Sequence, residues 1–198
     1  MSTAYLIDDD DAMRDALAWL LRSRGVPSRS WDCAEAFLAD YTTEMAGCLV
    51  LDMRMRAMTG MELFDRLREL GCAMPVIFLT GHGDVPLAVQ ALKNGAFDFL
   101  EKPFDDNQLV DRIIAALARD AEQRASGRAH DDLRARLATL SAREREVMEA
   151  ILAGKLNKVI ADEMGIAMRT VEVHRAHIFE KMGVKSAVEL ARRLSDNP

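Results

Sequence analysis

The sequence has few cysteines and no long apolar stretch, and each shortage excludes a class of protein. Its three cysteines, Cys33, Cys48 and Cys72, are odd in number and lack CxxC spacing, which argues against a disulfide framework or a zinc site. No apolar run approaches the ~20 residues of a membrane span. No basic segment followed by an apolar run marks a secretory signal at the N-terminus. We therefore expect a cytoplasmic protein with no membrane partner.

The charge is unevenly distributed along the 198 residues, which carry a formal net charge of -6. Residues 1–121 contain 20 acidic and 12 basic side chains, whereas residues 122–198 contain 12 acidic and 14 basic ones. An acidic first part and a mildly basic second part indicate two domains with different partners. The hydrophobic fraction of 49% and the charged fraction of 29% are typical of a globular protein.

Short apolar runs alternate with amphipathic segments through the first 120 residues. The runs are TAYLI, PSRSW (the weakest), GCLVLD, PVIFLT and FDFLEKP. Pairs with capping-box spacing mark helix starts between them, namely Asp32 with Glu35, Thr59 with Glu62 and, more loosely, Asp105 with Gln108. Five strands, each followed by a helix, predict an α/β fold with a doubly wound five-stranded parallel sheet covered on both faces.

The pattern becomes purely helical from Leu137 onward. Ser141 and Glu144 have capping-box spacing and open AREREVMEAILAG, after which come NKVIADEMG, MRTVEVHRAHIFEKMG and SAVELARRL. The polar segment 122–137 is predicted to be a partly helical linker with a candidate break at Ser126-Gly127. We therefore expect one domain over 1–121 and a small all-α domain of four helices over 138–198, which is large enough to fold alone.

Four consecutive aspartates, Asp8 to Asp11, follow the first predicted strand. Functional side chains of a parallel α/β sheet gather at the carboxyl ends of its strands. Right-handed crossovers can place the first strand beside the third, which ends at Asp52. Asp8, Asp9 and Asp52 would then converge, and Mg²⁺ (or Mn²⁺ in its place) is the natural counter-ion for a few carboxylates and a phosphate. Asp10 and Asp11 are interpreted as helix caps.

Two further strand ends supply groups that can meet a phosphoryl group. Thr80 follows PVIFL and offers a hydroxyl, and Lys102 follows FDFLE and offers an ammonium group. Lys102 precedes Pro103, where a cis peptide bond is permitted at modest cost and could aim the lysine inward. His82, in TGHGD, is interpreted as a loop residue rather than a catalytic base, since no serine or cysteine nucleophile has a motif nearby.

The stretches LIDDDDAMRD, CLVLDMRMRAMTGMEL, PVIFLTGHGD and GAFDFLEKPF resemble the receiver domain of two-component response regulators, most closely the FixJ-type branch. The resemblance spans residues 3 to about 121. It implies that Asp52 accepts a phosphoryl group from a sensor histidine kinase. It also implies that Asp9, Asp52 and the backbone carbonyl of Arg54 hold Mg²⁺, with Asp8 acting through water. The switch residues it implies are Thr80, Phe99 and Lys102.

On this resemblance the chain is a regulator and not an enzyme, apart from slow loss of its own phosphoryl group. The family usually has proline where this chain has Arg56, which leaves the loop more mobile and adds a cation near the acidic pocket. Altered phosphoryl lifetime or metal affinity is therefore expected. Two alternatives stay open: a pseudo-receiver that binds DNA without phosphorylation, and a Mg²⁺-dependent phosphohydrolase with Asp52 as nucleophile. The second is disfavoured because Arg54 stands where such enzymes need another aspartate.

The segment from Leu140 to about Leu194 resembles the LuxR/NarL-type four-helix DNA-binding domain, through LSAREREVMEAILAG, NKVIADEMGI and RTVEVHRAHIFEKMGVKS. Periodicity places a core face on the second helix of its helix-turn-helix, made of Val171, His174, Ile178 and Met182. The opposite face is free to enter the DNA major groove. The helix start is unusual because Ala167, where relatives often have serine, cannot cap.

The resemblance also implies specific contacts with promoter double-stranded DNA. The base-reading residues would be Glu172, Val173 and Ala176. The phosphate contacts would be Lys158, Arg169, Thr170, Arg175 and Lys185, with Asn157 capping the first helix of the pair. Residues 137–198 hold 10 basic and 9 acidic side chains, so one copy attracts DNA weakly. This favours a homodimer that reads a two-fold site. The resemblance implies that the dimer forms on phosphorylation through the helix near residues 85–94, and RNA polymerase is a candidate further partner.

Overall fold

The computed structural model describes residues 2–81 and 85–195, so His82 lies outside the described residues. Contacts divide the chain into two compact units, Met1–Gln123 and Arg124–Pro198. All three cysteines are free, as expected, and Cys48 is buried in the first unit. Burial, together with the nearby charge of Asp120, raises the pKa of the Cys48 thiol to about 12.

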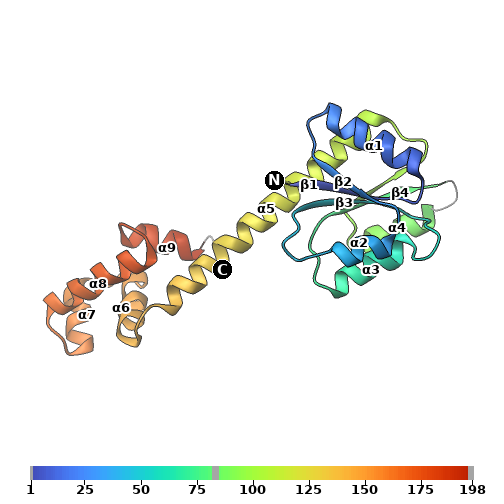
Figure 1. Cartoon of the computed structure of the whole chain (residues 1–198). Coiled ribbons are helices and arrows are strands. Elements are labelled where there is room, and N and C mark those ends of the chain that lie inside the picture. The colour runs from blue at the N-terminus through green and yellow to red at the C-terminus, as the bar shows by residue number, and fades with distance from the viewer. Residues whose placement is uncertain (1, 82–84, 196–198) are drawn as a thin grey trace. The chain divides into compact units, whose positions relative to one another are not determined.

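The first unit is built on a five-stranded parallel sheet (Figure 1). Its strands are β1 (Thr3–Ile7), β2 (Ser28–Trp31), β3 (Gly47–Asp52), β4 (Val76–Thr80) and β5 (Asp98–Glu101). Their order is β2-β1-β3-β4-β5, and every pairing is parallel. The predicted doubly wound sheet is confirmed, including the weak PSRSW run, and β1 lies beside β3 as expected.

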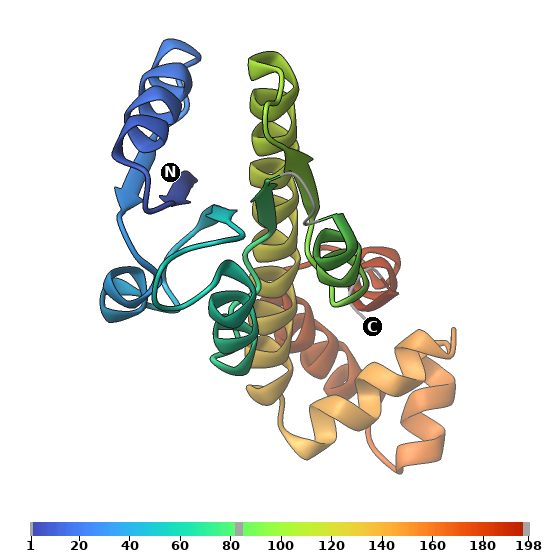
Figure 2. The same ribbon diagram turned by 90° about the vertical axis from the view of Figure 1, so that its right-hand side faces the viewer.

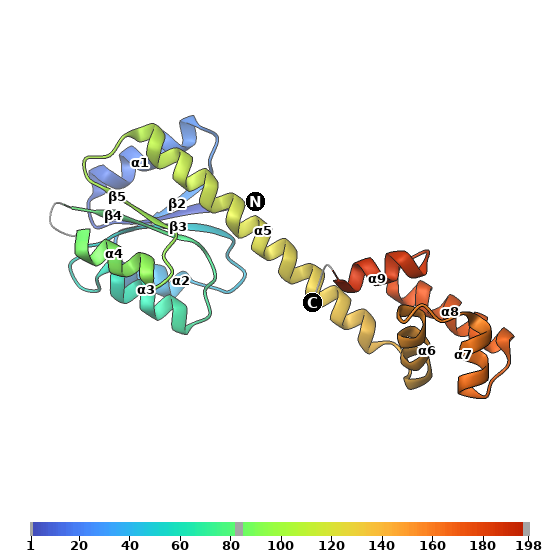
Figure 3. The same ribbon diagram turned by 180° about the vertical axis from the view of Figure 1, so that it is seen from behind.

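Helices cover both faces of this sheet. They are α1 (Asp11–Ser23), α2 (Ala34–Asp40), α3 (Gly60–Glu69), α4 (Val85–Lys93) and the beginning of α5 (Asp106–Ala138). Figure 3 shows α1 and α5 on one face and α2, α3 and α4 on the other; Figure 2 views the unit from the carboxyl ends of the strands. Each face has its own apolar layer, one around Phe37 and Leu63 and one around Leu21 and Ile113. Every residue of β3 is buried, as a central strand requires.

The capping predictions for Asp10, Thr59 and Asp105 are confirmed, whereas Asp11, also interpreted as a cap, is the first helical residue of α1 and pairs with Arg14. The Asp10 carboxylate accepts from the amides of Ala12 and Met13, and Thr59 and Glu62 form a full capping box. The Asp105 carboxylate accepts from the Gln108 amide at 2.9 Å.

The predicted Asp32–Glu35 capping box is wrong. The N-cap of α2 is Cys33, and it makes no side-chain capping bond. The helix begins one residue later than the spacing implied, so Glu35 lies two residues after the cap rather than three. From there it cannot serve as the acid of a capping box.

Helix α5 is continuous over 33 residues, so the candidate break at Ser126-Gly127 is wrong. Glycine in a helix interior costs only ~1 kcal/mol relative to alanine. The alanine, arginine and glutamine residues around Gly127 are strong helix formers that offset this cost. Although α5 is long, it is rich in charge, and across residues 2–81 and 85–195 no helix is both long and apolar enough to cross a membrane.

The second unit contains the four predicted helices, α6 (Ala142–Leu152), α7 (Asn157–Met164), α8 (Met168–Met182) and α9 (Ala187–Ser195). Their core includes Val147, Ile151, Ile160 and Leu190, together with Leu133 from the end of α5. On α8, the predicted core residues Val171, Ile178 and Met182 are buried. His174 is only half-buried, because it lies at the edge of the buried stripe.

Candidate functional site: an acidic pocket and a helix-turn-helix

The sheet brings the predicted pocket residues to one edge. Asp52 ends β3, Thr80 ends β4, and Asp8 and Lys102 directly follow β1 and β5. Ile7 pairs with Leu51 in the β1–β3 register, which sets Asp8 level with Asp52. The convergence expected of Asp8 and Asp52 is therefore present in the fold, whereas the expected third carboxylate, Asp9, pairs with Arg56 instead.

One ammonium group bridges two buried carboxylates in this pocket. The Nζ atom of Lys102 lies 3.0 Å from Oδ2 of Asp8 and 2.6 Å from Oδ1 of Asp52. Asp8 is 2% exposed and Asp52 7% exposed. The Lys102-Pro103 peptide bond is cis, and the Lys102 amide donates to the carbonyl of Thr80 at 2.7 Å. This hydrogen bond holds the backbone of Lys102 beside the end of β4.

The cluster of Asp8, Asp52 and Lys102 retains excess negative charge, since two carboxylates share one ammonium group. Burial raises the pKa of Asp52, and although Lys102 opposes this rise, the charge of Asp8 adds to it. Burial alone would lower the pKa of Lys102, but its hydrogen bonds to Asp52 and Asp8 outweigh burial and the pKa is raised. A further cation beside these carboxylates would stabilise their ionised forms.

Asp9 lies apart from this cluster and has its own partner. Its Oδ2 atom is 3.1 Å from Nε of Arg56, which belongs to the loop between β3 and α3. Arg54, in the same loop, donates its amide to Oδ2 of Asp52 at 2.7 Å. The structure thus joins Asp8 and Asp52 through Lys102 but pairs Asp9 with Arg56.

The donor set fits Mg²⁺, although it is not an all-protein cage. Within the described ranges, no three acidic, histidine or cysteine side chains converge closely enough to form a complete metal cluster. Mg²⁺ does not require one, because it usually keeps several waters and binds through one or two carboxylates plus a phosphate. Asp8, Asp9 and Asp52 offer hard oxygen atoms at one sheet edge, where negative charge is in excess.

Two of the three proposed switch residues, Thr80 and Phe99, lie on the neighbouring strands β4 and β5. Thr80 is fully buried, and its hydroxyl donates to the carbonyl of Leu100 on β5 at 3.3 Å. Phe99 is half-buried on β5, opposite Phe78 in the β4–β5 register, and it packs against the apolar layer under α3 and α4. Loss of the hydrogen bond from the Thr80 hydroxyl would therefore leave the Leu100 carbonyl of β5 without this donor.

Sequence reasoning missed two residues that shape the pocket. Arg14 donates to the carbonyl of Asp8 at 2.6 Å and pairs with Asp11, and the i, i+3 spacing of Asp11 and Arg14 was an available signal. Gly60 lies where a Cβ atom would stand 2.2 Å from the carbonyl oxygen of Asp52. Its need for glycine comes from this close approach and has no signal in the local sequence.

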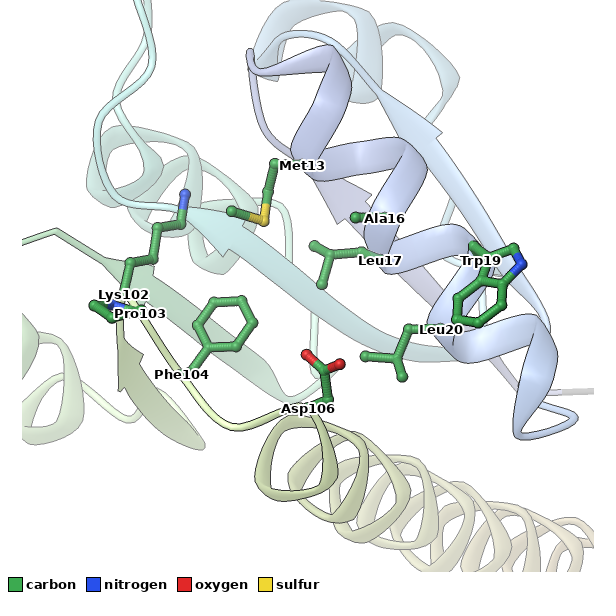
Figure 4. Close-up of a pocket in the computed structure, with 9 residues that line it drawn as sticks. All are labelled: Met13, Ala16, Leu17, Trp19, Leu20, Lys102, Pro103, Phe104 and Asp106. Carbon is green, nitrogen blue, oxygen red and sulfur yellow. The ribbon is translucent and has the colours of Figure 1, made fainter.

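A hollow of ≈ 390 Å³ lies beside the acidic edge, between α1 and the segment after β5. Figure 4 shows Met13, Leu17 and Leu20 on α1 facing Phe104 across it. Trp19 lies at the end away from Lys102 and is 64% exposed. The lining of this hollow is mainly apolar. The charged cluster therefore borders an apolar surface on the side of α1.

The second unit contains the expected helix-turn-helix, α7 and α8 joined at Gly165. This glycine closes α7 with a left-handed backbone (φ 64°), which favours glycine. Ala167 caps α8 without a side-chain bond, as predicted. The prediction that Asn157 caps α7 is wrong: Leu156 is the N-cap and Asn157 is the first helical residue, because the helix starts one residue earlier than assumed.

The predicted DNA-contact residues lie mostly on exposed surface. Exposed residues are Lys158, Arg169, Thr170, Val173, Ala176 and Lys185, while Asn157, Glu172 and Arg175 are half-buried. Arg169 and Glu172 pair with each other, with Nη1 and Oε2 3.1 Å apart. The guanidinium of Arg175 lies 5.3 Å from the ring centroid of Phe179. Two of the cations are therefore already engaged within α8.

A buried carboxylate that sequence reasoning identified only as a cap also ties α6 to α8. Glu144 accepts from the Ser141 amide at 2.8 Å, and its Oε2 atom lies 2.7 Å from Nζ of Lys181. The hydrogen bond to Lys181 is the main reason that the pKa of Glu144 falls to about 2. Because Lys181 lies near the end of α8, this contact fixes the orientation of α8 relative to α6.

Comparisons with known proteins agree with both halves of this geometry. Residues 4–114 match the response regulator receiver domain, and residues 138–194 match the bacterial regulatory proteins of the luxR family. The chain is 50% identical over 192 residues to the C4-dicarboxylate transport transcriptional regulatory protein DctR of Rhodobacter capsulatus, covering 96% of this chain and 98% of that one. It is 49% identical over 189 residues to the transcriptional regulatory protein FixJ of Bradyrhizobium diazoefficiens, covering 95% and 92%.

Two solved structures are similar over nearly the whole chain. The response regulator StyR has a TM-score of 0.91 at 41% identity, covering 98% of both chains. Full-length FixJ from B. japonicum has a TM-score of 0.63 at 45% identity, covering 99% of this chain and 97% of that one. These relatives are transcriptional regulators, which does not support the phosphohydrolase alternative. The chain belongs to the response regulators of two-component systems, with a receiver domain followed by a LuxR-type DNA-binding domain.

Proposed function

We propose that Asp52 is the phosphoacceptor of this response regulator and that its phosphorylation by a sensor histidine kinase controls promoter DNA binding. The bridge from Lys102 to Asp8 and Asp52 carries the proposal, because it concentrates charge at a buried strand end. An ionised Asp52 oxygen attacks phosphorus, a P–O bond forms, and the P–N bond to the kinase histidine breaks. Lys102 offsets the charge on the transferred group.

Metal binding belongs to the same proposal. Asp9, Asp52 and the backbone carbonyl of Arg54 would hold Mg²⁺, with Asp8 acting through water and Mn²⁺ as a substitute. The bound ion would neutralise negative charge on the phosphoryl group during transfer. The Asp52 oxygen that accepts the Arg54 amide is kept in place by that 2.7 Å bond. The excess negative charge around Asp52 supports this assignment.

The switch follows from the contacts of Thr80. When Asp52 is phosphorylated, the Thr80 hydroxyl leaves the carbonyl of Leu100 and donates to a phosphoryl oxygen. Phe99 then turns into the vacated space, which alters the β5 and α4 surface. Exposed apolar side chains on α4, including Leu87 and Val89, support homodimerisation through this face.

The output is DNA binding by the helix-turn-helix over residues 138–198, connected to the receiver of residues 1–121 through the segment 122–137. Glu172, Val173 and Ala176 would read base edges, flanked by phosphate contacts from cations such as Lys158 and Lys185. A dimer would place two α8 helices in successive major grooves, and RNA polymerase is the candidate partner beyond DNA. Promoter DNA as the target places the protein in the cytoplasm.

The first test is the intact mass after incubation with acetyl phosphate and Mg²⁺. We expect one added phosphoryl group in the native chain and none in Asp52→Asn. DNA binding is then compared between the two proteins before and after phosphorylation. No adduct, together with equal DNA binding by both proteins, would instead establish the phosphorylation-independent alternative that Arg56 keeps open.

A further inference from the structure

Arg56 is the only cation in the described residues with an ion pair to Asp9. Its Nε atom lies 3.1 Å from Oδ2 of Asp9, and the arginine side chain is 88% exposed. Asp9 itself is 27% exposed, so the pair lies at the mouth of the acidic pocket rather than inside it. The guanidinium thus pairs with a carboxylate oxygen that a divalent cation bound at this edge would need as a ligand.

Other carboxylates near this pair are alternative partners for the Arg56 guanidinium. Arg56 and Asp9 line a pocket of ≈ 300 Å³ together with Asp11, Asp32 and Glu35. A displaced guanidinium would remain among acidic side chains instead of losing all its partners. Release is therefore inexpensive, and the contact with Asp9 can be reversible under ordinary conditions.

We propose that Arg56 is an internal competitor for Asp9, so that a divalent cation binds this receiver only by displacing the guanidinium. This inference rests on the proposed metal site of the receiver. Lys102 already pairs with Asp8 and Asp52. With Arg56 on Asp9, each of the three carboxylates of the proposed metal site has a cationic partner before metal binds. Competition weakens Mg²⁺ affinity and ties receiver activation to the free Mg²⁺ concentration.

The size and salt dependence of the effect follow from the exposure of the pair. An exposed ion pair shifts an equilibrium by roughly 1.5- to 5-fold. Salt screens exposed charges over a Debye length of about 10 Å at 0.1 M. The penalty that Arg56 imposes on metal binding should therefore be largest at low salt and should shrink as salt rises.

The test is calorimetric titration of the full chain with MgCl₂, which reads binding and not phosphorylation. We expect Arg56→Gln to bind Mg²⁺ roughly threefold more tightly than the native chain at low salt, and Arg56→Lys, which keeps the charge, to stay close to native. Arg66→Gln is the matched control, because Arg66 is an exposed arginine in a 3.0 Å pair with Glu69 on α3. It removes one positive charge from the same domain and should change affinity little.

Three outcomes of the comparison between arginine variants would overturn the inference. Arg56→Gln could match the native affinity, Arg66→Gln could tighten binding as much, or the ratio between native and Arg56→Gln could stay constant in 0.5 M KCl. Asp9→Asn separates this failure from failure of the metal site. If the native chain binds Mg²⁺ and Asp9→Asn does not, the site stands whatever Arg56 does. If both bind alike, Asp9 is no ligand and the competition falls with it.

Discussion

Nζ of Lys102 lies 2.6 Å from Oδ1 of Asp52, and the same atom lies 3.0 Å from Asp8, so one ammonium group serves two carboxylates. The pair joins β5 to β3, two strands that do not neighbour each other in the sheet. A change in the charge on Asp52 would therefore act directly on Lys102, which immediately follows β5, the strand that contains Phe99.

Replacing Lys102 by alanine should slow phosphorylation more than it disturbs the fold. Two nearby carboxylates would lose their shared cation, so the Asp52 pKa would rise further and the transferred charge would be less well offset. We expect the initial rate with acetyl phosphate, read by intact mass, to fall at least about tenfold, or roughly 1.4 kcal/mol. Lys102→Arg should recover part of the rate. An unchanged rate in the alanine variant would remove Lys102 from the phosphorylation site.

The position of this cluster could be predicted because a parallel sheet turns sequence order into spatial order. Asp8, Asp52, Thr80 and Lys102 each end or follow an apolar run, and the carboxyl ends of parallel strands meet at one edge. Nothing more than the strand assignment was needed to bring them together. The roles of Thr80 and Phe99 as a switch are a different matter, because they require a second state.

The failures share a cause, which is that spacing rules see only local sequence. The Asp32–Glu35 spacing suited a capping box, but the register of α2 made Cys33 the cap. The requirement for glycine at residue 60 depends on how closely α3 approaches the Asp52 carbonyl, which only packing decides. The contact of Glu144 with Lys181 joins residues 37 positions apart, beyond any local pattern.

Acid should weaken the DNA-binding unit through Glu144. Its pKa lies at about 2 in the folded protein against an ordinary 4.5, chiefly because of Lys181. A depressed carboxyl pKa gives stability that is present above about pH 4.5 and lost as the pH falls toward 2. The difference in Tm between native protein and Glu144→Gln, followed by circular dichroism, should be widest near neutral pH and close between pH 5 and 2. A difference that is constant over this range would contradict the assignment.

Two glycine-to-alanine changes should act in opposite directions. Gly127 lies in the interior of α5 with no neighbour within 4 Å of a new Cβ, so Gly127→Ala should stabilise the local helix by ~1 kcal/mol. Amide exchange around residue 127 should then slow roughly fivefold.

Gly60→Ala would instead push the Asp52 carbonyl away, costing about 1–3 kcal/mol and impairing phosphorylation. If Gly60→Ala were as stable and as readily phosphorylated as the native chain, the close approach would be wrong.

Freeing Arg169 from its partner should change how the helix-turn-helix binds DNA. Nη1 of Arg169 lies 3.1 Å from Oε2 of Glu172, so a proposed phosphate-contact cation and a proposed base-reading acid are paired with each other. Glu172→Gln removes the acid, so Arg169 becomes available to a phosphate on any sequence. Non-specific affinity for a random duplex, measured by fluorescence anisotropy, should rise, and the slope of log K against log salt should steepen by about 0.9 for one added phosphate contact. Arg169→Gln is the matched control, since it breaks the same pair without freeing a cation and should bind less tightly. If both variants bound alike, the pair would have no part in DNA binding.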